Sequence, residues 1–368
     1  MKKLKLFLLL TFVILNTITA QNKLIVIKAN SNQVDIREGK RFLKKVWTIS
    51  PDIKPDIFFT SAKKVTFYTD IDSITTTINI KDSLFEFVIL LNGKDSAFTQ
   101  IKYQESKLSI LKTAAKYDYT DKKYMPNFSY QSSENPNLIK IRTELKLDSI
   151  AGSGNEISKI LNLMHWLHNL IPHDGINGNP EIKNALNMIT VCKKEVRGLN
   201  CRGLAMVLNE CYLSLGFNSR YVTCLPKDTT DQDCHVINMV FSNDLNKWIW
   251  IDPSFDAYIL NEKGELLGIE EVRERLINGK PLILNPDANW NRQISQTKDI
   301  YLESYMAKNL YKLETPLVSE YNTETIEKGK VITYVQLLST VDIPENRQRN
   351  VYPTYFTHNP TLFWAKPE

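Results

Sequence analysis

Histidine and cysteine are scarce in this chain of 368 residues, which contains only five of each. Residues 21–131 contain neither. That stretch can therefore form neither a thiol–imidazole pair nor a metal site with histidine or cysteine ligands. Any chemistry of these kinds must lie in the rest of the chain.

An excess of charge of one sign is also missing. The chain has 46 lysine and arginine residues, three of them at positions 2–5, against 41 acidic residues. This near-neutral balance gives no electrostatic basis for binding nucleic acid. We therefore expect no nucleic-acid partner.

Long apolar runs are missing too, apart from residues 6–15, which follow Lys2, Lys3 and Lys5. Ten residues are too few to span a bilayer. We expect a signal peptide over residues 1–20, cleaved after Ala20, and export to the periplasm or the extracellular space. No membrane span is expected after cleavage.

The odd number of cysteines leaves one without a disulfide partner in an exported chain. Cys201 is expected to be that one, because oxidation would block its chemistry. Two bridges in any of three pairings would use the remaining four, Cys192, Cys211, Cys224 and Cys234. Cys224 and Cys234 are the favoured pair because they flank a polar loop. The alternative, weighted equally, is that all five are reduced.

Cys201 lies where a helix is expected to begin. Asn200 is a good N-cap, and apolar side chains repeat at helical spacing over residues 204–215 before Gly216 ends the helix. Unpaired N–H groups and the helix dipole favour a thiolate at a first helical position. The alternative is a buried and inert cysteine.

Two strand-like runs follow this helix, separated by the turn residues Asn243 and Asp244. In an antiparallel hairpin centred on these two residues, His235 lies opposite Asp252, with their Cβ atoms about 4.5–5.5 Å apart. Asp252 would then orient the imidazole and stabilise its protonated form, while the other ring nitrogen faces the thiol.

A cysteine at a helix start, a histidine that opens a strand and an aspartate at the end of the next strand follow in this order along the chain. This arrangement resembles the transglutaminase-like superfamily of papain-fold thiol enzymes. The resemblance covers about residues 156–254, with Gly198 three residues before the cysteine. It implies an α+β fold in which a helix carrying Cys201 packs on an antiparallel sheet carrying His235 and Asp252. By the same resemblance, Cys201 is the nucleophile, His235 the general base and acid, and Asp252 the orienting carboxylate.

The implied function is cleavage of an amide or peptide bond through an acyl-enzyme. Hydrolysis is favoured over acyl transfer because water is always present, and the expected partner is a peptide, a protein or another amide-containing substrate. We expect no cofactor and no metal. The alternatives are protein-glutamine acyl transfer, a non-catalytic peptide- or glycan-binding protein, and a metal-dependent hydrolase that uses His165, His168 and Asp174.

The pattern of the chain predicts four parts after the signal peptide. They are an all-β, sandwich-like domain at 21–115, a connecting segment at 116–150, the catalytic core at 151–282, and an extension at 283–368 that packs on the core. The first domain has β-branched and aromatic runs and an Asn92-Gly93 hairpin signal, and we expect it to act as a brace.

Within the core, helices are expected at residues 157–170 and 269–278, and a further helix at 296–313. Residues 138–147 fit a strand or a helix equally well. Residues 171–197 are expected to form a long loop with a short helical stretch at 181–188, and this loop is our candidate for the wall that faces the substrate. The candidate cleft residues are Asn200, Trp166, His173 and Trp250, although tryptophans are more often core residues.

Overall fold

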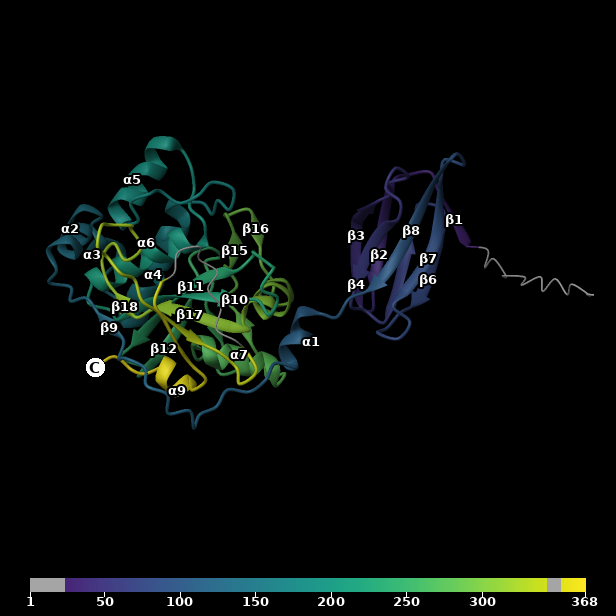
Figure 1. Cartoon of the computed structure of the whole chain (residues 1–368). Coiled ribbons are helices and arrows are strands. Elements are labelled where there is room, and N and C mark those ends of the chain that lie inside the picture. Colours follow the sequence, from purple (N-terminus) through teal and green to yellow (C-terminus); the bar gives the residue numbers. More distant parts are fainter. Residues whose placement is uncertain (1–23, 343–351) are drawn as a thin grey trace, which may run out of the picture. The chain divides into compact units, whose positions relative to one another are not determined.

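The computed structural model describes residues 24–342 and 352–368, so the predicted signal peptide lies outside the described residues. The chain divides into two compact units, residues 1–105 and 106–368 (Figure 1). Among the described residues, no helix combines the length and the apolar character that crossing a membrane requires.

The first unit consists of two four-stranded sheets, with strand orders β1-β7-β8-β4 and β3-β2-β5-β6. The strands are β1 (Ile25–Ala29), β2 (Gln33–Glu38), β3 (Arg41–Thr48), β4 (Asp56–Thr60), β5 (Lys64–Tyr68), β6 (Ser73–Thr77), β7 (Leu84–Leu91) and β8 (Asp95–Tyr103). Buried side chains of both sheets, including Val34, Phe67 and Phe87, form a single core.

The predicted hairpin in this unit is confirmed. Strands β7 and β8 pair in antiparallel fashion, and the chain turns at Asn92 and Gly93, whose φ angles are 53° and 67°. Asparagine and glycine tolerate this left-handed conformation better than other residues, which is why the dipeptide marks the turn.

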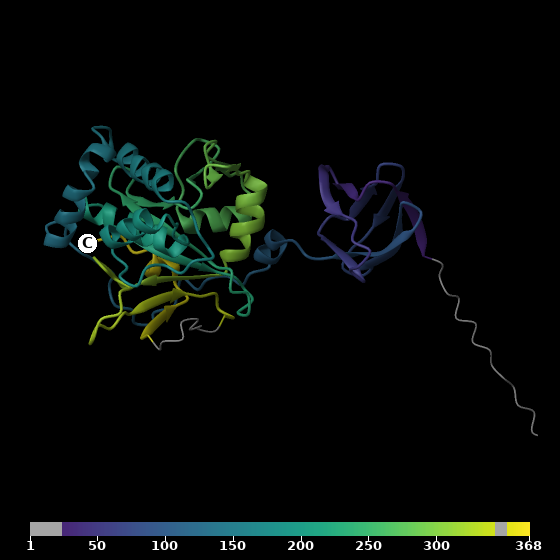
Figure 2. The ribbon, with the colours of Figure 1, turned by 90° about the horizontal axis from the view of Figure 1, so that it is seen from above.

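The second unit is built on a six-stranded sheet of order β12-β11-β10-β17-β19-β20. Its strands are β10 (Ser219–Leu225), β11 (His235–Ser242), β12 (Lys247–Ile251), β17 (Lys312–Pro316), β19 (Tyr334–Leu337) and β20 (Thr354–Thr357). Short pairs add β9 (Ser129–Tyr130) with β18 (Val318–Ser319), β13 (Ile259–Leu260) with β14 (Ile283–Leu284), and β15 (Asn289–Trp290) with β16 (Ile294–Ser295). Figure 2 shows the late strands, in yellow, at one edge of the unit.

The helices of this unit, taken in chain order, are α1 (Lys107–Lys112), α2 (Pro136–Glu144), α3 (Leu147–Ala151), α4 (Glu156–Leu170), α5 (Ala185–Glu195), α6 (Cys201–Ser214), α7 (Ile269–Ile277), the π-helix η1 (Asp299–Met306), α8 (Ala307–Asn309) and α9 (Pro360–Phe363). Helices cover both faces of the sheet. Alternate residues of β11 separate the two cores: Val236 and Val240 pack with α2 to α6, whereas Ile237 and Met239 pack with α7, η1 and α8.

Several expected elements are found where local signals are strong. Helix α4 begins after the N-cap Asn155, and α7 ends before Gly279, whose φ is 64°. The ambiguous segment at 138–147 contains helix α2 and buries Leu138 and Ile141. Helical structure therefore prevails there because its apolar positions pack against the core.

Two expectations about elements need correction. The helix within the 171–197 loop is α5, which is longer and later than expected because Asn184 caps it. The expected helix at 296–313 ends early, since η1 and α8 stop at Asn309 and β17 takes residues 312–316 into the sheet.

The hairpin register also differs from the prediction. Asn238 pairs with Ile251 and Ser242 with Lys247, so the register has slipped by two residues relative to a pairing of His235 with Asp252. The carboxylate of Glu156 accepts hydrogen bonds from the backbone N–H groups of the turn and holds a four-residue loop. An even slip leaves each side chain on its expected face.

Candidate active site

The start of α6 holds the thiol. Cys201 is the first helical residue, and the Asn200 side chain accepts a hydrogen bond of 3.0 Å from the Gly203 backbone N–H, as expected for an N-cap. Asn179 braces this cap by donating from its side-chain amide to Asn200 Oδ1 at 2.7 Å. A Cβ at Gly203 would lie 2.5 Å from Asn179 Oδ1, so glycine there lets the brace approach the helix.

The Cys201 thiol is half-buried between two imidazoles. Burial by itself would raise the pKa of the thiol, but side-chain hydrogen bonds with His173 and His235, together with the charge of the rings, lower the pKa to about 6. At neutral pH the thiol is therefore mostly ionised, which is the nucleophilic form.

His235 opens β11 and is 1% exposed. Its Nε2 donates to Asp252 Oδ2 over 2.7 Å. Burial would lower the pKa of this imidazole, but the negative charge of Asp252 and the hydrogen bond outweigh that effect and raise the pKa to about 10. The pair thus holds a proton on the ring next to an ionised thiol.

Asp252 is fully buried just beyond the end of β12. Its Oδ1 accepts from the Ser254 backbone N–H at 2.9 Å, and its Oδ2 also accepts from the Tyr301 hydroxyl at 2.6 Å. A backbone bridge between Asp252 and Ala257 folds the chain into a tight loop here. These contacts let the carboxylate reach His235 although the two residues are not paired in the hairpin.

His173 reaches the thiol because its backbone runs beside the segment that precedes Cys201. His173 bridges Leu199, and a Cβ on Gly198 would lie 2.3 Å from the Pro172 carbonyl oxygen, so only glycine permits this approach. The side chain of Asn291 bonds both the N–H and the carbonyl of His173. The ring lies 4.3 Å from the Trp290 ring, measured between centroids.

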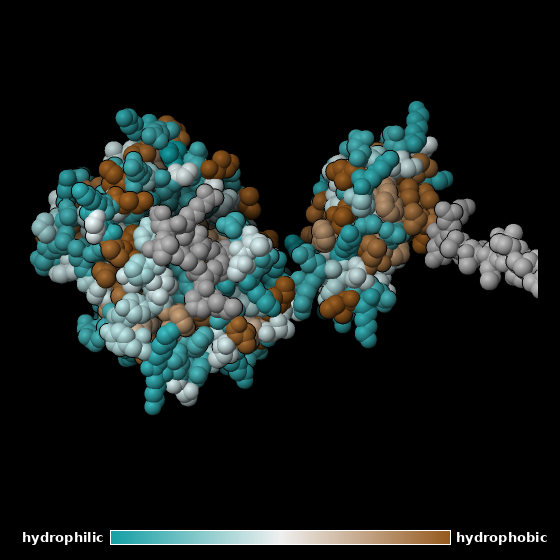
Figure 3. All heavy atoms as spheres, viewed as in Figure 1, coloured by the Kyte–Doolittle hydropathy of each residue, from teal (hydrophilic) through white to brown (hydrophobic). Residues whose placement is uncertain are grey.

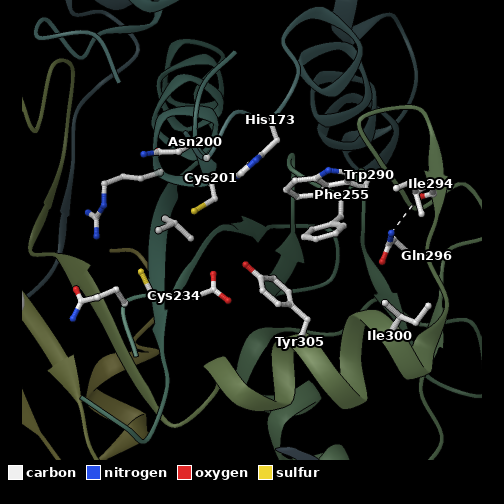
Figure 4. Close-up of a pocket in the computed structure, with 15 residues that line it drawn as sticks. His173, Asn200, Cys201, Cys234, Phe255, Trp290, Ile294, Gln296, Ile300 and Tyr305 are labelled. Atoms are coloured by element: carbon white, nitrogen blue, oxygen red, sulfur yellow. Dashed lines mark hydrogen bonds between the residues drawn. The ribbon is translucent and has the colours of Figure 1, made fainter. Parts of the chain in front are cut away.

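A cavity of about 610 Å³ opens at the thiol (Figure 4). Figure 4 shows the His173 ring beside Cys201, with Trp290 and Phe255 next to it and Tyr305 facing them from η1. The lining residues are His173, Gly175, Asn200, Cys201, Arg202, Gln232, Asp233, Cys234, Val236, Phe255, Trp290, Ile294, Gln296, Ile300 and Tyr305. The Tyr305 hydroxyl lies 3.3 Å from His235 Nδ1, so the ring nitrogen that does not contact Asp252 points toward this space.

The four candidate cleft residues separate into two groups. Asn200 and His173 line the cavity, whereas Trp166 and Trp250 are not among its lining residues. Trp250 is fully buried behind the site and donates to the Tyr301 hydroxyl at 3.1 Å. The expectation that Trp250 faces the cleft is therefore corrected, because its strand position directs it into the core.

The three residues of the metal hypothesis have separate partners. His165 contacts Asp256 at 2.7 Å, and His168 lies between the Pro253 carbonyl and Asn289. The Asp174 carboxylate accepts from the turn that follows it. Within residues 24–342 and 352–368, no group of three histidine, cysteine or acidic side chains is arranged to hold a metal ion.

All five cysteines are free thiols, which agrees with the second of the two alternatives, and the favoured Cys224–Cys234 bridge of the first is absent. Cys224 pairs across the sheet with His235, so its side chain packs in the core on the His235 face. Cys234 precedes His235 by one residue and lines the cavity instead. The alternation of side chains along the strand points the two thiols apart.

Sequence reasoning missed the aromatic residues of the site, which are Phe255, Trp290, Tyr301 and Tyr305. Tyr301 and Tyr305 are four residues apart on the π-helix, a rare element that often occurs at functional sites. Their spacing fits an ordinary helix face, so the sequence carried no signal that these hydroxyls reach Asp252 and His235.

Comparisons with known proteins agree with the resemblance drawn from the residues. Residues 144–253 match the family model of the Transglutaminase-like superfamily. No curated protein matches the chain.

Two solved structures are similar over part of the chain. One is a candidate cysteine protease from Cytophaga hutchinsonii, with 21% identity, a TM-score of 0.26, and coverage of 31% of this chain and 37% of that chain. The other is red sea bream transglutaminase, with 12% identity, a TM-score of 0.22, and coverage of 63% of this chain and 49% of that chain. The chain thus spans less than half the length of either structure. The family match confirms the recognition made from the residues: residues 144–253 carry a domain of the transglutaminase-like superfamily.

Proposed function

We propose that this protein is an exported thiol enzyme that hydrolyses an amide or peptide bond through an acyl-enzyme on Cys201. The observation that carries the proposal is the meeting of a thiol of lowered pKa, a buried imidazole of raised pKa and a buried carboxylate beside one cavity. Groups with pKa values pushed apart in this way are typical of acid–base and nucleophilic sites.

In the first half of the reaction, the Cys201 thiolate attacks the carbonyl carbon and an S–C bond forms. In this proposal, the backbone N–H of Cys201, at the helix start, and the ring of His173, which hydrogen-bonds the thiol, stabilise the oxyanion. The C–N bond then breaks, and His235 gives its proton to the leaving amine.

In the second half, His235 accepts a proton from water and the water oxygen bonds to the acyl carbon. The S–C bond breaks, the carboxylic acid leaves and the thiolate is restored. Asp252 stabilises the imidazolium at each stage where the ring is charged. An amine in place of water would give acyl transfer through the same acyl-enzyme. Hydrolysis is therefore a more specific proposal than acyl-enzyme formation on Cys201.

Two further parts of the proposal concern the N-terminal part of the chain. The basic and apolar start of the sequence supports export. The first unit is proposed to be a sandwich-like brace, since its two sheets share one core and it lacks histidine and cysteine.

The test is to trap the acyl-enzyme. The protein is incubated with a peptide anilide, quenched in acid and examined by intact mass and peptide mapping. An adduct at Cys201 that is absent in Cys201→Ser supports the proposal. Release of the aniline by Cys201→Ser at the wild-type rate overturns it. Adding a primary amine measures how the acyl-enzyme divides between reaction with water and reaction with the amine. A product that is mainly the carboxylic acid supports hydrolysis over transfer.

A further inference from the structure

The cavity around Cys201 has two unlike walls. One wall is apolar and aromatic, and Figure 4 shows its members on one side of the thiol: Phe255, Trp290, Ile294, Ile300 and Tyr305. The rings of Phe255 and Trp290 pack together, with their centroids 4.8 Å apart, and Gln296 adds one polar side chain on the same side of the cavity. The other wall is polar and includes Asn200, Arg202, Gln232 and Asp233.

The charges on the polar wall are already compensated. Arg202 donates to Glu324 at 2.6 Å and to Thr223 at 2.8 Å, and Asp233 accepts from Lys308 at 2.7 Å. Neither charge is held ready for a charged side chain of a substrate. The cavity therefore offers little to a strongly acidic or basic group next to the thiol.

The apolar wall, in contrast, has surface to bury. Ile294 is 57% exposed and Ile300 is 42% exposed, and both line the cavity. Covering such surface is favourable by about 25 cal/mol per Å². On the face of the second unit that Figure 3 draws, apolar residues form separate small groups among hydrophilic ones.

The acyl carbon becomes bonded to Cys201 Sγ, so the side chain next to that carbon must fit within the space around the sulfur. We infer that Trp290, Ile294 and Ile300 form a specificity wall for a large apolar or aromatic side chain on the acyl side of the scissile amide. This inference rests on the proposed function and names its substrate class.

The test uses peptidyl chloromethyl ketones that differ only in the residue next to the reactive carbon, which is Phe, Leu, Gly, Glu or Lys. The thiolate displaces chloride, an S–C bond forms, and mass spectrometry locates the adduct. We expect the Phe and Leu reagents to modify Cys201 at least about tenfold faster than the Gly, Glu and Lys reagents.

Matched variants place the effect on the wall. Each rate is divided by the rate with iodoacetamide, which has no side chain to seat. Ile300→Glu should lower this ratio for the Phe reagent about tenfold. Ile139→Glu, at 44% exposure on α2 and outside the cavity lining, should leave the ratio unchanged.

The outcomes separate the two proposals. Rapid iodoacetamide labelling of Cys201 with equal rates for the five reagents, or with the Glu or Lys reagent fastest, overturns the specificity wall and leaves the thiol enzyme standing. Iodoacetamide labelling of Cys201 that is as slow as in denatured protein overturns both the specificity wall and the proposed thiol enzyme.

Discussion

The two imidazoles beside Cys201 stand in opposite surroundings. His235 is 1% exposed and donates to the buried carboxylate of Asp252. His173 is half-buried, packs against the Trp290 ring at an interplanar angle of 45°, and has a buried Nδ1 without a hydrogen-bond partner among the described residues. His235 is thus paired with a buried carboxylate, whereas the ring of His173 lies against an aromatic ring. In the proposed mechanism, His235 therefore transfers the proton, and His173 donates a hydrogen bond to the thiolate and the oxyanion.

The largest effect should come from His235. Replacement by alanine in His235→Ala removes both the proton donor and the counter-charge of the thiolate, and kcat should fall about 10⁴-fold. Steady-state hydrolysis of the peptide anilide measures this loss. A variant that keeps a tenth of wild-type kcat would show that His235 is not the acid and base.

A smaller effect is expected for His173. Removing one oxyanion donor costs about 10²-fold in kcat, so His173→Ala should be clearly less impaired than His235→Ala. His173→Gln keeps an N–H donor and should recover part of the loss. The control is His165→Ala, whose side chain is 65% exposed and lies outside the cavity lining. Equal losses of kcat in His173→Ala and His235→Ala would contradict the different roles proposed for the two imidazoles.

The placement of His173 can be disturbed without touching its ring. In Gly198→Ala the new Cβ must displace the Pro172 carbonyl, so the variant should lose about 1–3 kcal/mol of unfolding free energy and about tenfold in kcat. Gly178→Ala is the matched control, since a Cβ there meets no atom within 4 Å. Urea denaturation and the anilide assay give the two values. Wild-type behaviour of Gly198→Ala would contradict the close approach.

The smallest effect concerns the support of Asp252. Tyr301→Phe removes a hydrogen bond of 2.6 Å to the carboxylate, and its net cost is about 0.5–1.5 kcal/mol, or roughly two- to thirteenfold in kcat. Tyr301 and His235 both donate to Asp252 Oδ2, so removing the hydroxyl leaves more negative charge beside the imidazolium, and the descending limb of the pH–rate profile should move to higher pH. A loss of kcat without that movement would indicate a merely structural role.

Local signals in the sequence were enough to predict the thiol's position. Asn200, the apolar spacing and Gly216 predict the helix that starts at Cys201. The sequence also has Gly198 three residues before the thiol, but it does not show why residue 198 must be glycine. The reason is tertiary, since the carbonyl that excludes a Cβ belongs to Pro172. Contacts that join distant segments leave no periodicity to detect.

The same limit explains the errors on the His235 side. The hairpin register depends on Glu156, which binds the turn from another helix, and the support of Asp252 comes from Tyr301 on a π-helix. The face to which each side chain of the hairpin points was predictable because alternation along a strand is local. The register was not predictable because it depends on a contact with a distant segment. Near the C-terminal end of the described residues, Phe363 is fully buried and its carbonyl accepts from Arg220.

The pH dependence of Cys201 alkylation tests the central claim, that the thiol is ionised by the imidazoles beside it. Iodoacetamide rates at Cys201 are measured by mass spectrometry across pH in the wild type and in His235→Ala. The thiolate forms as pH rises, so the wild-type rate should increase with a midpoint near pH 6, and the midpoint should rise toward the ordinary value of 9.0 in the variant. A wild-type midpoint near that of denatured protein, or one that His235→Ala leaves in place, would contradict the account.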